Sequence, residues 1–163
     1  STHPWGIFPG TGHAESVGEG TGEGFNINIP FRGGMGDASF QDAVDRVVLP
    51  VVEQYDPKAV LVSLGSDGHY ADPLGGLTMS SPGYVETYLT GHRLARDLGL
   101  GGATYFLEGG YDLDALSEVV WGVHEGFSGR SVEYGLTEVR DSTGEGSDIV
   151  DNVVRIHKDY WEL

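Results

Sequence analysis

Cysteine is absent from the 163 residues of this chain, which excludes disulfide bonds and thiolate metal sites. No apolar run approaches the roughly 20 residues that a membrane-spanning helix needs, so we expect no membrane partner. No basic-then-apolar signal segment opens the chain, and we therefore expect a cytoplasmic protein. No internal repeat is present. The length fits one domain that is large enough to bury a core.

Positive charge is also scarce, because nine lysines and arginines face 25 acidic residues and the formal net charge is −16. A field of one sign and this size repels phosphate backbones, so we expect no nucleic-acid partner. The same surface suits a cationic substrate. It equally suits a protein that stays soluble in high salt, and this halophilic explanation says nothing about chemistry.

Three short runs have the composition of strands, at residues 25–31, 59–64 and 103–107. A stretch with helical spacing of apolar residues follows each of them. Strand and helix therefore alternate three times, which predicts an α/β fold with a parallel sheet and right-handed crossovers. Residues 1–24 are rich in glycine and read as a loop.

The expected helices carry recognisable boundaries. Asp37 can cap the first helix, which Pro50 should kink or interrupt near its last turn. Ser81 is expected to cap the second helix and Gly99 to end it, and Asp112 to cap the third. We divide the chain into a body over residues 1–127, an acidic linker or surface loop over 128–147, and a terminal segment, 148–163. A helix over about 148–161 is expected to pack on the body.

Two of the predicted strands end in residues that can do chemistry. One runs into Asp67 and a glycine-rich turn, and the other runs into Gly109, Gly110 and Tyr111. The carboxyl ends of neighbouring parallel strands lie at one edge of the sheet, and open α/β proteins bind their ligands at this edge. A carboxylate there could ligate a divalent cation or act as a base, and a phenol could donate to a developing oxyanion. The structural alternatives are a turn-forming aspartate and a packed tyrosine.

Asp67 and His69 also have the spacing of two metal ligands on an extended segment. Gly68 lies between them and favours a turn, which would point the two side chains apart. Asp72 precedes Pro73 and is interpreted as a turn residue. The other histidines are scattered and form no pair.

Four motifs, taken in chain order, resemble the histone deacetylase family, in its prokaryotic acetoin-utilisation and acetylpolyamine amidohydrolase-like members. They are Phe8-Pro9-Gly10-Thr11-Gly12, then Gly24 to Pro30, then Gly65-Ser66-Asp67 with Asp72-Pro73-Leu74, and Leu107 to Tyr111. The resemblance covers residues 1 to about 127, and the closing helix is also similar to the tail of these enzymes. It implies the parallel-sheet arginase/deacetylase fold and zinc-dependent hydrolysis of an N-acetyl amide, with an acetylated amine as substrate.

The resemblance also implies roles for single residues. Asp67 matches the aspartate that is the last of three zinc ligands. Tyr111 matches the catalytic tyrosine that polarises the scissile carbonyl and stabilises the oxyanion. His69 is not a ligand in that family. Four further residues match the lining of the substrate tunnel: Phe8, Leu74, Gly109 and Gly110.

Part of the family's machinery has no counterpart in this chain. The tandem histidines that act as base and acid, and the Asp-x-His segment with two zinc ligands, belong to the first half of the domain. The chain resembles the C-terminal half only. A catalytic zinc needs about three protein ligands, so we expect no activity from this chain alone. The missing strands should leave an apolar sheet edge and face exposed, through which the chain can oligomerise.

Three functions remain open at this stage. The leading one is a zinc-dependent deacetylase that is active when the upstream half completes it. The second is a non-catalytic binding or assembly module that keeps half of the deacetylase fold. The third is a metal-dependent hydrolase that uses Asp67 and His69 in some other scheme.

Overall fold

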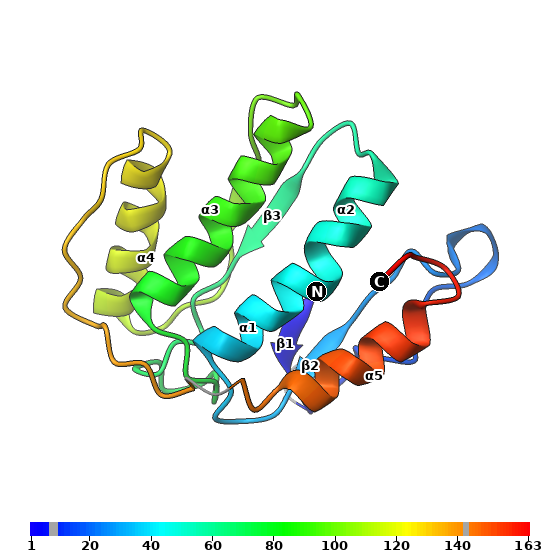
Figure 1. Ribbon diagram of the computed structural model, residues 1–163. Coiled ribbons are helices and arrows are strands. Elements are labelled where there is room, and N and C mark those ends of the chain that lie inside the picture. Colours follow the sequence, from blue (N-terminus) through cyan, green and yellow to red (C-terminus); the bar gives the residue numbers. More distant parts are fainter. Residues whose placement is uncertain (7–9, 142–143) are drawn as a thin grey trace.

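The computed structural model describes residues 1–6, 10–141 and 144–163 (Figure 1). Its strands form two parallel pairs: β1 (Thr2–Pro4) with β2 (Ile29–Phe31), and β3 (Leu61–Leu64) with β4 (Thr104–Leu107). The predicted α/β fold with parallel strands is confirmed. In the described residues, however, the sheet is divided into two pairs, since no ladder joins β2 to β3.

The strand predicted over residues 25–31 is shorter in the structure, where β2 covers Ile29–Phe31. Residues 25–28 stay outside the ladder because they are tied to the preceding loop, where the Asn26 N–H donates to the Val17 carbonyl at 3.3 Å. The opening segment is not all loop. Its β1 strand pairs with β2, and a 3₁₀ turn covers Gly20–Gly22.

The helical segment that follows β2 passes its proline without a break. It comprises α1 (Asp37–Ala43), a π-helical turn (Val44–Val48) and α2 (Leu49–Tyr55). Pro50 has no N–H to donate, and its ring crowds the preceding turn. The wider π turn lies immediately before Pro50, where it absorbs this mismatch and lets the helix continue.

The next two helices, α3 (Ser81–Asp97) and α4 (Leu113–Gly126), lie side by side, and β3 is seen between α3 and α2 (Figure 1). The cap predicted for α3 is wrong by one residue, because the Ser80 Oγ accepts the Gly83 N–H at 3.1 Å. Gly99 follows α3 with a left-handed φ of 77°, as expected. Asp112 caps α4, also as expected, by accepting the Ala115 N–H at 2.9 Å.

Small residues decide which face of α4 is buried. Helical spacing favours a face with Leu113, Leu116, Val120, Val123 and Phe127; of these Val123 is buried, whereas Leu113 and Val120 are exposed. The buried face also carries Val119 and Gly122, and it packs closely on α3, since a Cβ on Gly122 would lie 2.6 Å from a methyl group of Val85. Six large apolar side chains on β3, β4 and α4 are exposed: Leu61, Phe106, Leu107, Leu113, Val120 and Trp121.

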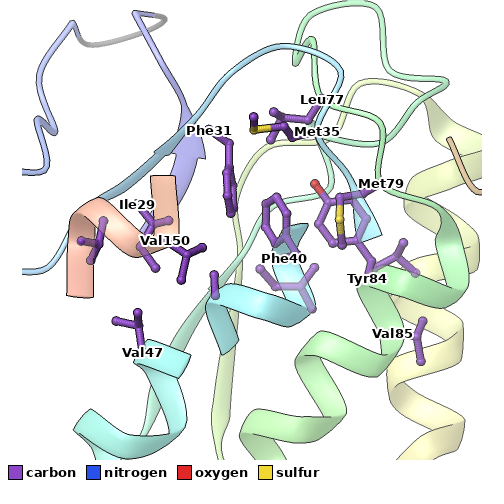
Figure 2. Close-up of a cluster of buried hydrophobic side chains, with 14 of the residues drawn as sticks. Ile29, Phe31, Met35, Phe40, Val47, Leu77, Met79, Tyr84, Val85 and Val150 are labelled. Atoms are coloured by element: carbon purple, nitrogen blue, oxygen red, sulfur yellow. The ribbon is translucent and has the colours of Figure 1, made fainter. Parts of the chain in front are cut away.

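The core runs from the junction of α1, β2 and α5 (Ser147–His157) to α3 and α4. Figure 2 shows Phe31 and Phe40 next to each other, with ring centroids 5.0 Å apart, and Val150 of α5 close by. The last helix ends at His157, earlier than predicted. The residues after His157 do not continue the helix. They are joined to the first part of the chain, because the Trp161 indole N–H donates to the Gly24 carbonyl at 2.8 Å. Among the described residues, no helix combines the length and the apolar character that crossing a membrane requires.

One buried carboxylate fastens the segment 128–147 to the start of α1. Asp141 accepts the backbone N–H of Gly36 at 2.8 Å and that of Ser39 at 3.1 Å, and it also bonds the Ser39 hydroxyl. Its other oxygen accepts the Gly144 N–H at 3.0 Å. Most of this acidic segment is exposed, but Asp141 makes it part of the packed structure.

We expect the Asp141→Ala substitution to lower the free energy of unfolding by about 2–4 kcal/mol, because it leaves several buried N–H groups without acceptors. Urea unfolding of the purified chain measures this change. The matched control is Asp148→Ala, which removes an exposed ion pair with Arg32 and should cost less than about 1 kcal/mol. Equal losses in the two variants would contradict the role given to Asp141.

The same carboxylate should make stability depend on pH. Burial raises the pKa of Asp141, but hydrogen bonds from Ser39, Gly36 and Glu145 outweigh burial and hold this pKa below its ordinary value. The stabilisation is therefore present above about pH 4 and is lost as the pH falls further through the folded-state pKa. We expect unfolding curves from about pH 5 to about pH 3 to lose stability less steeply for Asp141→Asn than for the unsubstituted chain. Identical slopes would show that Asp141 does not titrate in this way.

Candidate functional site

The candidate site lies where β3 and β4 end. The pairing of these strands continues past the ladder, because the Glu108 N–H donates to the Leu64 carbonyl at 2.8 Å and the Ser66 N–H to the Gly109 carbonyl at 2.9 Å. These two bonds keep the segments that follow the strands next to each other. Asp67 therefore lies beside Gly109, as the strand order predicts.

Two glycines let the β4 segment come this close. A Cβ on Gly109 would lie 2.8 Å from Oδ2 of Asp67, which is closer than real Cβ contacts allow. Gly110 has φ of +134°, and a Cβ there would overlap the hydroxyl of Ser66. A side chain at Gly109 would have to displace the Asp67 carboxylate and one at Gly110 the Ser66 hydroxyl, and the positive φ of Gly110 favours glycine as well.

Tyr111 follows these glycines and has 58% of its surface exposed. Its backbone N–H donates to Oδ2 of Asp72 at 2.6 Å, while Oδ1 of the same carboxylate accepts the Leu74 N–H at 2.9 Å. Leu74 is 62% exposed, so neither of these two side chains is enclosed in a tunnel by the described residues. Phe8, the expected aromatic wall, lies outside the described residues.

Asp72 makes more contacts in the structure than its sequence context predicts. The local part of its role, a turn closed on Leu74, can be read from the Asp-Pro pair. Its bond to Tyr111 joins residues that lie 39 positions apart, and no local pattern signals such a bond.

His69 is a structural residue in this arrangement. The ring is fully buried, and its Nδ1 accepts the Ala71 N–H at 3.1 Å. The proton is thereby assigned to Nε2, which lies 3.2 Å from the Ser81 hydroxyl. Burial lowers the pKa of His69, which favours the neutral ring. Since both ring nitrogens are engaged, the hydrolase scheme that pairs His69 with Asp67 has no geometric support.

The Asp67 carboxylate fits one ligand position of a divalent metal. It is partly exposed at the strand edge, and no described residue makes a hydrogen bond or an ion pair with it. Carboxylate oxygens are established zinc ligands. Residues 1–6, 10–141 and 144–163 contain no group of three histidine, cysteine, aspartate or glutamate side chains that could hold a metal. Asp67 therefore fits as a single ligand of a larger set.

A family model and curated relatives match this chain, and all of them are deacetylases by name. The family model "Histone deacetylase domain" matches residues 1–127. The chain is 40% identical over 129 residues to histone deacetylase 10, chloroplastic, of Oryza sativa subsp. japonica, which covers 79% of this chain and 29% of the relative. It is 33% identical over 174 residues to a probable deacetylase of Archaeoglobus fulgidus, covering 99% of this chain and 48% of the relative.

Solved structures agree with this match. The HD domain of HDA15 superposes with a TM-score of 0.82 at 31% identity, covering 98% of this chain and 43% of that one. The histone deacetylase Clr3 superposes with a TM-score of 0.84 at 31% identity, covering 99% of this chain and 27% of that one. The chain thus spans less than half the length of these relatives. In sequence and in fold, the chain belongs to the histone deacetylase family.

Proposed function

We propose that this chain supplies part of the active site of a zinc-dependent deacetylase that hydrolyses the N-acetyl amide of acetyl-lysine or a related acylated amine. Membership of the histone deacetylase family supports deacetylase function in general. The observation that carries the specific proposal is the juxtaposition of Asp67 with the segment Gly109–Tyr111 at the shared end of β3 and β4.

The two candidate residues have different tasks in this proposal. Asp67 holds the metal, because its carboxylate is free of protein partners among the described residues. Zinc, when bound, would supply a Lewis acid and lower the pKa of a water molecule. Tyr111 donates its phenol O–H to the oxygen of the acetyl group as negative charge develops there. Its exposure leaves the phenol accessible to a substrate.

The proposal requires residues beyond those described here. Catalytic zinc sites use about three protein ligands, and Asp67 is the one that this arrangement provides. A positioned general base contributes about 10²–10⁴-fold to the rate, and His69 is not placed to act as one, because both ring nitrogens are engaged. We therefore propose that the remaining ligands and the base come from another segment, and that this chain alone is inactive.

The charge of the chain suits a substrate with net positive charge, just as it suits solubility in high salt. A formal net charge of −16 attracts cations over a distance and raises their concentration near the surface. The acyl-lysine side chain is neutral, so such a field favours a peptide or polyamine that carries other positive charges, whereas an anionic acyl compound is repelled. The preference should weaken as salt screens the field.

The first test substitutes the two proposed functional residues in the full-length, zinc-loaded protein, assayed on acetyl-lysine peptides. Tyr111→Phe should lower kcat by about 100-fold or more, the usual cost of losing one oxyanion donor. Asp67→Asn should weaken zinc binding beyond the roughly 100-fold that loss of an outer-shell partner costs. Tyr55→Phe is the matched control, since Tyr55 is 57% exposed and lies on α2. Unchanged turnover in both Asp67→Asn and Tyr111→Phe would refute the assigned roles.

A second test probes the space around Asp67. Gly109→Ala places a methyl group 2.8 Å from Oδ2 of Asp67 and should displace the carboxylate. We expect zinc affinity, measured by competition with a chelator, to fall about 10- to 100-fold. The control is Gly101→Ala, where a Cβ meets nothing within 4 Å and the positive φ costs only about 1–2 kcal/mol of stability. Zinc affinity that is equal in the two variants would mean that Asp67 does not hold the metal.

A further inference from the structure

We infer that Asp72 is a positioning residue for Tyr111, and that its carboxylate sets the place of the phenol relative to Asp67. The inference rests on the proposed function, since it concerns how the catalytic tyrosine is held. It assigns Asp72 a role beyond closing a turn, because the carboxylate joins two segments that are distant in sequence.

The contacts of Asp72 are directed at the Tyr111 backbone. Oδ2 accepts the N–H of Tyr111 at 2.6 Å and that of Asp112 at 3.1 Å, while Oδ1 accepts the Leu74 N–H at 2.9 Å. A carboxylate at this point also faces the amino end of α4, where the helix dipole favours negative charge. Three backbone donors therefore fix the carboxylate in one orientation.

Asp72 is itself held from the core. Its backbone N–H donates to the His69 carbonyl at 2.9 Å. The His69 ring is buried against Tyr84, with ring centroids 6.4 Å apart, and contacts the Ser81 hydroxyl at the start of α3. A continuous set of contacts thus runs from α3 through His69 and Asp72 to Tyr111.

The Tyr111 segment needs such support. It follows Gly109 and Gly110, whose backbones are the least restricted of any residue type. The last bond that continues the pairing of β3 and β4 runs from the Ser66 N–H to the Gly109 carbonyl, and α4 begins only at Leu113. Among the described residues, the Tyr111 N–H has Asp72 as its acceptor. A displacement of about 1 Å at a catalytic group can cost about 100-fold in rate, so this bond should matter for turnover.

The experiment compares Asp72→Ala and Asp72→Asn with a matched carboxylate, Asp37→Ala. Asp37 also accepts a backbone N–H across elements, from Ser80 at 2.8 Å, but among the described residues its hydrogen bonds involve neither Asp72 nor Tyr111. We expect Asp72→Ala to lower kcat about 100-fold with KM and zinc affinity unchanged. Asp72→Asn keeps one acceptor oxygen and should lose less. Asp37→Ala should lose stability but keep its kcat at temperatures where it is folded.

Two further readouts separate positioning from a general loss of structure. In the Tyr111→Phe background, Asp72→Ala should lower kcat little further, because the phenol whose place it sets is already absent. Amide hydrogen exchange of Tyr111 should be faster in Asp72→Ala than in the unsubstituted protein, whereas the β3 amides should be unchanged.

A normal kcat in Asp72→Ala, or an equal loss in the Tyr111→Phe background, would overturn the inference. So would an Asp37→Ala variant that loses as much kcat as Asp72→Ala. If the unsubstituted zinc-loaded protein does not deacetylate, the proposed function fails separately, and the exchange rate of the Tyr111 amide then decides whether Asp72 holds this segment.

Discussion

The parallel register of β3 and β4 is the constraint on which the candidate site depends. Leu61 pairs with Thr104 and Leu64 with Leu107, and the bond from the Ser66 N–H to the Gly109 carbonyl extends this alignment beyond the strands. Two segments that carry an aspartate and a tyrosine are thereby brought to one edge. A shift of one residue would turn every side chain of a strand to the opposite face and would separate the two groups.

Loops in this chain are held by carboxylates that accept backbone N–H groups. Asp141 joins the acidic segment to α1, Asp37 joins α1 to the residue before α3, and Asp72 joins the two halves of the site. Each carboxylate replaces a ladder or helix bond that the local backbone cannot make, which keeps otherwise unpaired donors satisfied. Part of the high acidic content therefore has a structural use, besides its effect on the field around the molecule.

Local patterns predicted most elements correctly because their causes lie within a few residues. The runs that form β3 and β4 were expected, and so was the cap at Asp112, since an N-cap acts on an N–H three residues later. The prediction that Ser81 caps α3 was wrong. Ser80 is the cap, and contacts from distant parts of the chain hold both serines, since Asp37 accepts the Ser80 N–H and His69 lies against the Ser81 hydroxyl.

The sequence by itself determined the order of strands and helices from residue 25 onward, the family motifs, and the two residues, Asp67 and Tyr111, that follow the strand ends. Only the tertiary structure decided that Asp72 contacts Tyr111, that His69 is buried with both nitrogens engaged, and that α4 turns Val119 inward and leaves Val120 exposed. The physical reason is distance along the chain. Hydrophobic spacing and capping act over one or two turns, whereas these contacts depend on how separate elements pack.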